Sequence, residues 1–192
     1  MKRLGHIILI ASAMPFLQAC GNKTKNSSTA KADSIDILRD TAAKQAVNVE
    51  KGDGQFAVEA ASGGITEIEL GKLAEQKATD RMVKNFGAMM VKDHSKADDK
   101  LQALAKAKNI NLPNGPSAAE QQVIDKLTKL SGRDFDKAYI SDMIDVHKND
   151  IREFKYASKN CNDPDIKHFA TKTLPVLQNQ LDAIKEVNAN MK

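Results

Sequence analysis

Apolar residues recur at helical spacing through most of this chain, and no segment shows the alternating pattern of a half-buried strand. The clearest case lies within residues 80–108, where steps of four and three residues separate Val83, Gly87, Met90, His94, Ala97, Leu101 and Leu104. Steps of this size place side chains on one face of an α-helix. The pattern therefore predicts an all-α fold.

Helix start and stop signals divide the chain from Asp53 onward into four long helices and one short helix. The N-terminal signals are Asp53, Thr79 or Asp80, the Ser117–Glu120 capping box, and Asp163 followed by proline. Two prolines and a glycine within residues 109–116, and Ser-Gly at 131–132, break the chain. The predicted helices cover residues 53–78, 80–108, 117–130, 133–159, and 164 to near the C-terminus, where Pro175 should kink the last helix or interrupt its hydrogen bonding.

Four long helices of similar length indicate an antiparallel bundle. The short helix lies in the connection between the second and third long helices, and its length of about 21 Å could carry the chain along the bundle. We therefore predict a ferritin-like four-helix bundle with an extra short helix in that connection. An up-down bundle with a helical cap is the alternative.

One polar residue lies near the midpoint of each long helix, on or close to its apolar face. These residues are Glu67, His94, His147 and Gln180. Midpoints of antiparallel helices meet at one level whichever way the helices run. The four side chains are therefore expected to converge in one central layer.

Three interpretations of this layer remain open. The first is a metal site for iron, manganese or zinc, with Glu67, His94 and His147 as ligands, because carboxylates and imidazoles on facing helices hold these metals in bundle proteins. The Glu-x-x-His pairs of di-iron bundles are missing, since Val91 and Ile144 stand three residues before the two histidines. The sequence therefore does not predict a di-metal centre.

The second interpretation is a buried hydrogen-bond network that fixes the register of the helices. In this case Gln180, which is a poor ligand for those metals, is a natural member of the layer. The third interpretation is that the histidines are separate and reach water or backbone partners. The sequence alone favours the network, and it predicts no firmly bound cofactor.

The N-terminus resembles a bacterial lipoprotein signal. Lys2 and Arg3 precede a short apolar run, and Leu-Gln-Ala at 17–19 leads into Cys20. The segment before Cys20 is too short to span a bilayer, which needs about 20 apolar residues. Residues 1–19 are thus predicted to be a signal peptide, Cys20 to be lipidated, and residues 20–52 to form a flexible tether, with residues 53–192 forming the bundle.

This signal predicts a lipoprotein of the cell envelope that contacts a membrane through its N-terminal lipid. Gly21 and Asn22 follow Cys20 in place of the aspartate that often retains lipoproteins at inner membranes, so the outer membrane is favoured. The domain would face the periplasm or the exterior. Protein partners are not indicated by any distinctive surface pattern.

Charge and cysteine content exclude other classes of function. The full chain has 29 Lys and Arg against 25 Asp and Glu, and without residues 1–19 the basic total falls to 27. This near balance, with no nucleic-acid-binding signature, does not predict a nucleic-acid partner. Cys161 stands in a predicted turn without a nearby basic cluster, so a catalytic thiol is not expected.

Several segments resemble the DUF4142 family of exported bacterial proteins. They are FAVEAASGGITEIELGKLAEQKA from Phe56, VKNFGAMMVKDH from Val83, FDKAYISDMIDVH from Phe135 and FATKTLPVLQNQL from Phe169. The resemblance implies a ferritin-like bundle without an assigned activity. The family pattern has glutamate at the position of Glu67 and histidine at those of His94 and His147, and it usually has histidine where this chain has Gln180.

No nucleophile elbow, phosphate-binding loop or activated cysteine is evident in the sequence. The sequence therefore favours a non-catalytic binding or structural module of the envelope over an enzyme. The alternative is a metal-binding bundle that uses glutamate and histidine in its core.

Overall fold

The computed structural model describes residues 49–191; the predicted signal peptide, Cys20 and most of the predicted tether lie outside them. Helices account for nearly all of the described residues, which include no strand. The helices are α1 (Lys51–Lys77), α2 (Arg81–Lys108), α3 (Ala118–Thr128), α4 (Gly132–Asn160) and α5 (Pro164–Asn190). Within residues 49–191, no helix combines the length and apolar character needed to cross a membrane. The predicted all-α fold is thus confirmed.

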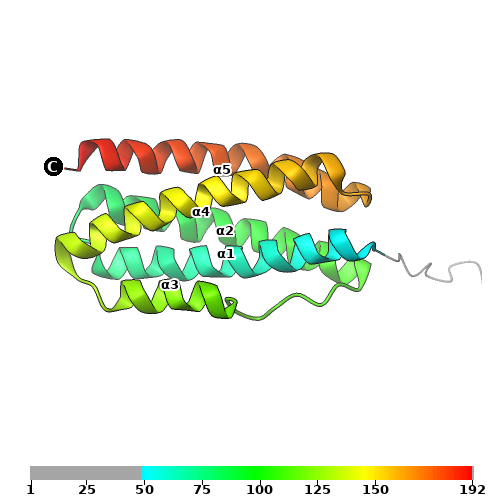
Figure 1. The fold of residues 1–192 in the computed structure, drawn as a ribbon, viewed down its shortest axis with the longest axis horizontal. Helices are drawn as coiled ribbons and strands as arrows, with labels where there is room; N and C mark the ends of the chain where they lie inside the picture. The colour runs from blue at the N-terminus through cyan, green and yellow to red at the C-terminus, as the bar shows by residue number, and fades with distance from the viewer. Residues whose placement is uncertain (1–48, 192) are drawn as a thin grey trace, which may run out of the picture. The chain divides into compact units, whose positions relative to one another are not determined.

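The four long helices form two antiparallel hairpins. Helices α1 and α2 make one hairpin, α4 and α5 make the other, and the most extensive helix contacts lie within these pairs. The hairpins face each other through contacts of α2 with α5 and of α1 with α4 (Figure 1). Each hairpin therefore buries its apolar stripe against the other.

The connection between α2 and α4 carries the chain along the bundle. Helix α2 ends at one end of the bundle and α4 begins at the other, so residues 109–131 travel back between the two ends (Figure 1). Helix α3 lies in this connection and packs against α1 and α4. This is the ferritin-like crossover predicted from the sequence, and the up-down alternative is wrong.

Three of the predicted helix starts are confirmed by side-chain caps. The Asp80 carboxylate accepts the Met82 N–H at 2.6 Å, and Ser117 and Glu120 form a reciprocal capping box at the start of α3. Asp163 caps α5, whose first residue is Pro164. These caps satisfy N–H groups that have no partner within their own helices.

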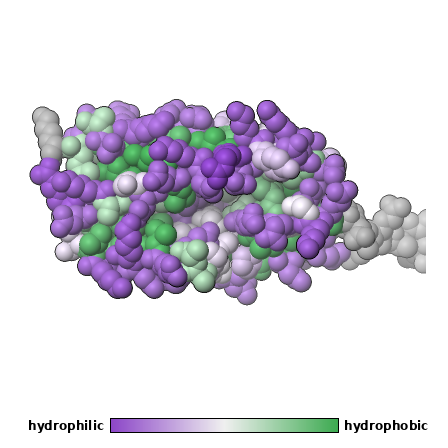
Figure 2. All heavy atoms as spheres, viewed as in Figure 1, coloured by the Kyte–Doolittle hydropathy of each residue, from purple (hydrophilic) through white to green (hydrophobic). Residues whose placement is uncertain are grey.

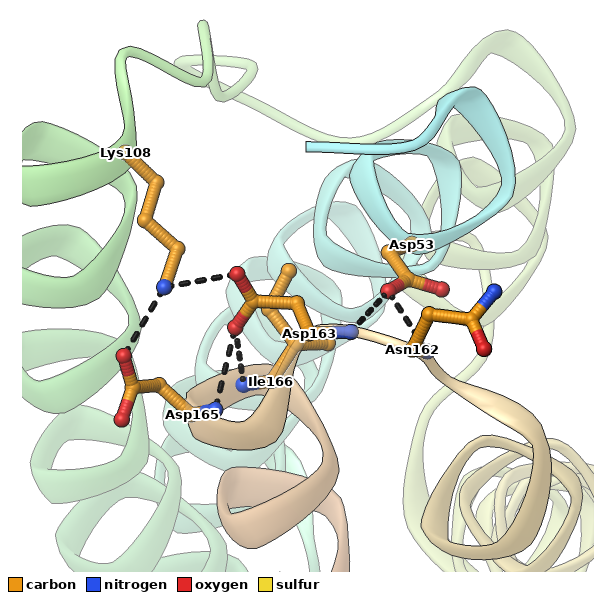
Figure 3. A network of polar contacts seen from close by, with 6 residues as sticks. All are labelled: Asp53, Lys108, Asn162, Asp163, Asp165 and Ile166. Atoms are coloured by element: carbon orange, nitrogen blue, oxygen red, sulfur yellow. Dashed lines mark hydrogen bonds and ion pairs between the residues drawn. The ribbon is translucent and has the colours of Figure 1, made fainter. Parts of the chain in front are cut away.

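The prediction that Asp53 caps its own helix is wrong. Helix α1 begins at Lys51 with Glu50 in the N-cap position, which places Asp53 inside the first turn. Its buried carboxylate instead accepts the N–H groups of Asn162, at 2.9 Å, and Asp163, at 2.7 Å (Figure 3). Asp53 therefore ties the start of α1 to the α4–α5 turn.

A buried lysine strengthens the same end of the bundle. The Lys108 ammonium at the end of α2 lies 2.7 Å from Asp163 and 2.8 Å from Asp165 (Figure 3). Burial opposes ionisation of Asp163, but the hydrogen bond from Lys108 and the N–H groups of Ile166 and Asp165 lower the pKa of this carboxyl. The carboxylate thus joins α2 to the start of α5.

Helix α5 passes through Pro175 without interruption. Proline has no N–H to donate, so the carbonyl of Thr171 receives no α-helical hydrogen bond from this position. The predicted loss of a hydrogen bond follows from this chemistry, but the helix continues to Asn190.

Buried apolar residues form two clusters, one toward each end of the bundle. The first cluster contains Leu70, Phe86, Met90, Tyr139, Met143 and Ile184 among others. The second contains Ala57, Leu101, Phe154, Ile166 and Leu177 among others. In each of the four long helices the residues of the two clusters occupy separate stretches of sequence, so the clusters meet at a single level.

Candidate functional site

Each long helix places one buried polar side chain where the two apolar clusters meet. Their exposed fractions are 2% for Glu67 on α1, 6% for His94 on α2, 0% for His147 on α4 and 1% for Gln180 on α5. The sequence places all four at the same boundary, between the residues of one cluster and those of the other. The structure thus brings together the layer that was predicted from the helix midpoints.

Glu67 lies between the two histidines. Its Oε2 atom is 3.0 Å from His94 Nδ1, and its Oε1 atom is 3.6 Å from His147 Nε2. The imidazole rings stand almost perpendicular, at 87°, with their centroids 6.4 Å apart. One potential ligand atom from each of the three residues lies within 4.8 Å of the others, so a single ion could contact all three.

The tautomer of His147 is fixed by its own helix. Its Nδ1 atom is 2.8 Å from the carbonyl oxygen of Met143. A carbonyl can only accept, so Nδ1 carries the hydrogen and the neutral ring keeps its lone pair on Nε2. This is the arrangement in which a histidine ligand is oriented by a backbone carbonyl behind it.

The polar layer leaves several buried atoms without a hydrogen-bond partner. They are Glu67 Oε1, His94 Nε2, His147 Nε2 and Gln180 Oε1. The Gln180 amide nitrogen makes a long contact, 3.4 Å, with Asp93 Oδ2, and the Gln180 side chain partly opposes the lowering of the pKa of both imidazoles by burial. Buried polar groups in folded proteins are nearly always paired. The protein groups alone therefore do not complete the hydrogen-bond network that the sequence favoured.

Burial shifts the pKa values of the layer toward uncharged forms. The pKa of Glu67 is raised well above its usual range by burial and by the nearby carboxylates of Asp150 and Glu120. Burial, with His147 close by, lowers the pKa of His94 to about 4, and burial also lowers the pKa of His147. Both imidazoles are therefore neutral at pH 7, which is the form that binds a metal.

A cavity of about 390 Å³ adjoins Glu67 and His94. Gly63 and Gly64, one turn before Glu67 on α1, line it, and a Cβ atom built at Gly64 would meet nothing within 4 Å. The missing side chains thus leave space beside the polar layer. Figure 2 shows a mostly hydrophilic surface that is hollowed near the middle of the face over α1 and α4.

The cavity is strongly acidic, which the sequence reasoning missed. Among the described residues, no lysine or arginine lines it. Six carboxylate residues do: Glu59, Glu67, Asp98, Glu120, Asp150 and Glu153. Burial, together with Glu120 and Glu153, raises the pKa of Asp150 to about 7. The available signal was spacing, because Asp98 and Asp150 follow the two histidines by four and three residues, on the same helix faces.

Cys161 is not part of this site. It lies at the C-terminal end of α4, in the short turn before α5, and it is buried and forms no disulfide within residues 49–191. Burial, aided by Asp53, raises the pKa of its thiol to about 11. The thiol is therefore a poor nucleophile at neutral pH.

Solved structures with the same fold include two DUF305 proteins and a copper-bound protein. A DUF305 fragment from Deinococcus radiodurans is 10% identical with a TM-score of 0.66, and the match covers 75% of this chain and 99% of that one. A DUF305 protein from Streptomyces coelicolor is 14% identical with a TM-score of 0.61, and the match covers 71% of this chain and 90% of that one. CopM in its Cu(II)-bound form is 15% identical with a TM-score of 0.61, and the match covers 72% of this chain and 96% of that one.

These identities are low, so the structural matches show a shared fold and nothing more specific. A comparison with curated proteins gave no match. Residues 38–187 match the family described as "Domain of unknown function (DUF4142)", which covers most of the chain and agrees with the resemblance found in its helices. The chain therefore belongs to the DUF4142 family.

Proposed function

We propose that this protein binds one divalent transition-metal ion through Glu67, His94 and His147. The observation that carries the proposal is a set of buried atoms without a hydrogen-bond partner, namely one carboxylate oxygen and one nitrogen from each imidazole, in three residues whose potential ligand atoms lie within 4.8 Å of one another. An ion at this position would accept lone pairs from all three residues. It would thereby satisfy groups whose burial otherwise lowers the stability of the protein.

The donor set limits the choice of metal. Two imidazoles and one carboxylate suit zinc, copper, iron and manganese better than calcium or magnesium, which prefer oxygen ligands. Three protein ligands leave at least one coordination position for water, as in zinc sites with an open position. Because Glu67 and His94 also line the cavity, that position would face the cavity.

Copper has support beyond the donor set. CopM, which shares the fold at 15% identity, has been solved in a Cu(II)-bound form. Such a distant likeness does not transfer ligands, but it makes Cu(II) a metal to test alongside Zn(II), Mn(II) and Fe(II). The amide of Gln180 would then help to position the layer and would not be a ligand.

The setting of this metal site is proposed from the sequence. Cys20, after a signal peptide of residues 1–19, would carry a lipid that holds the bundle at a membrane of the cell envelope. The bundle would thus be a non-catalytic binding module outside the cytoplasm, with no nucleic-acid partner. Mass spectrometry of the native protein tests the anchor, because an unmodified N-terminus upstream of Cys20 would contradict it.

Metal titration of the protein without a histidine tag tests the metal site. We expect one tight ion per chain, and we expect Glu67→Gln and His147→Ala each to weaken binding at least tenfold. His168→Ala is the matched control, because His168 is exposed on α5 and is not a member of the layer. The proposal fails if the purified chain takes up less than about 0.2 ion at saturating metal, or if the control weakens binding as much as the site variants.

A further inference from the structure

The acidic cavity beside the polar layer is not explained by the metal site, which needs only its three ligands. We propose that this cavity is the path by which a hydrated divalent cation reaches Glu67 and His94, an inference that rests on the proposed function. Its carboxylates hold the ion with its water shell before the ion moves to the imidazoles.

The size of the cavity fits a hydrated ion. At about 30 Å³ per water in the liquid, 390 Å³ holds roughly a dozen waters. A divalent cation with an octahedral shell brings about six. The space is available because α1 has glycine at positions 63 and 64, the second of which would carry a Cβ atom into open space.

The charge of the cavity fits a cation. Asp98 and Glu120 lie on different helices from Asp150, and no basic residue among the described lining offsets their charge. The Asp98 Oδ1 atom is buried and has no hydrogen-bond partner. Like-charged groups in a low-dielectric cleft focus the field and attract counter-ions. A cation in the cavity would relieve their mutual repulsion.

The two ends of the cavity differ in chemistry. At the inner end, Glu67 Oε1 and His94 Nε2 are unpartnered, and their residues are only 2% and 6% exposed. At the outer end, Glu120 is held in place, because its Oε2 atom accepts hydrogen bonds from the Ser62 hydroxyl and, at 2.6 Å, from the Ser117 N–H. Carboxylate oxygens that can hold a hydrated ion therefore lead to imidazole nitrogens that can replace its waters.

Stopped-flow loading of Cu(II) tests this path. The chain has no tryptophan and two tyrosines, so a Tyr156→Phe background leaves buried Tyr139 as the sole fluorophore, close enough to Glu67 for that charge to affect its pKa. Quenching of Tyr139 by Cu(II) then reports arrival at the site. We expect Asp98→Asn with Asp150→Asn to lower the association rate constant at least fivefold and to leave the dissociation rate constant unchanged.

A matched double variant removes the same charge elsewhere. Asp99→Asn with Asp145→Asn changes exposed residues on the same two helices, outside the cavity lining. We expect it to change the association rate constant by less than twofold. Equal rates in the two double variants would overturn the path while leaving the metal site intact. Faster dissociation from the cavity variant would also overturn it, because the carboxylates would then be ligands of the bound ion.

A steric variant tests the path independently of charge. Gly64→Leu would fill the cavity from α1, whereas Gly64→Ala would leave most of it open. We expect the leucine variant to slow Cu(II) loading at least fivefold relative to the alanine variant, with the same number of ions bound at equilibrium. Equal loading rates would contradict the proposal. If the unmodified protein binds no Cu(II), the metal site itself fails for this ion, and the loading path fails with it.

Discussion

Glu67 is only 2% exposed, and one oxygen atom of its carboxyl group has no hydrogen-bond partner. Burial raises the pKa of this carboxyl group in the folded protein. As the pH rises above the unfolded-state pKa of about 4.3, the group therefore lowers the stability of the metal-free protein. We predict that Glu67→Gln stabilises the metal-free protein at pH 7 by about 1–3 kcal/mol, the usual cost of a buried unsatisfied group. Urea unfolding in the presence of a chelator measures this difference.

The pH dependence of the same variant identifies the cause. The gain from Glu67→Gln should vanish as the pH falls below about 4, where the carboxyl group becomes protonated in both folded and unfolded chains. Glu186→Gln, on an exposed position of α5, should change stability by less than about 0.5 kcal/mol at either pH. A destabilising Glu67→Gln would show that the carboxylate serves the structure of the metal-free bundle.

The residues of the layer could be predicted because each one interrupts an apolar stripe near the midpoint of its helix. The residues that line the acidic cavity could not be predicted from the sequence. Spacing places Asp98 and Asp150 on the helix faces of the two histidines, but the sequence gives no sign that glycines on α1 leave a hollow beside them. That property depends on how all five helices meet around the cavity. Likewise, the sequence suggested a complete hydrogen-bond network, and only the distances show that it is incomplete.

Helices α1 and α2 approach each other closely at one pair of glycines. A Cβ atom built at Gly71 would lie 2.7 Å from the carbonyl oxygen of Gly87, and one built at Gly87 would lie 2.7 Å from that of Gly71. We predict that Gly71→Ala destabilises the protein by about 1–3 kcal/mol, because the two backbones must separate. Helix propensity alone would predict a gain of up to about 1 kcal/mol. Thermal or urea unfolding shows whether the substitution lowers or raises the stability of the protein.

Gly64→Ala is the control for this element, since its Cβ atom would meet no neighbour. It should stabilise the protein by up to about 1 kcal/mol, as expected for glycine replaced by alanine inside a helix. If Gly71→Ala is also stabilising, the close crossing of α1 and α2 is wrong.

Helix starts were predictable where a helix caps itself, as at Asp80 and Asp163. The role of Asp53 was not predictable, because its carboxylate accepts N–H groups in the turn before α5, more than a hundred residues further along the chain.

At the scale of the whole molecule, the order of buried residues encodes the fold. Each long helix carries residues of one apolar cluster, then a polar residue, then residues of the other cluster, and the order reverses between antiparallel neighbours. Four long helices of similar length, and a connecting helix long enough to travel along the bundle, made the ferritin-like topology predictable. The three candidate ligands come from both hairpins, with Glu67 and His94 on one and His147 on the other. A bound ion would therefore join the two halves of the bundle.

This cross-link predicts a large effect of metal on thermal stability. An ion that binds only the folded chain stabilises it by about 2.7 kcal/mol at a free concentration of 100 times Kd. For a domain of this size that corresponds to a rise in melting temperature of roughly 10 °C. Calorimetry with and without Zn(II) or Cu(II) measures the rise, and a chelator should reverse it. At the same metal concentration, His147→Ala should reduce the rise by about half or more because it removes the ligand on the second hairpin, whereas His168→Ala should preserve it. An equal rise in both variants would place the stabilising ion elsewhere on the protein.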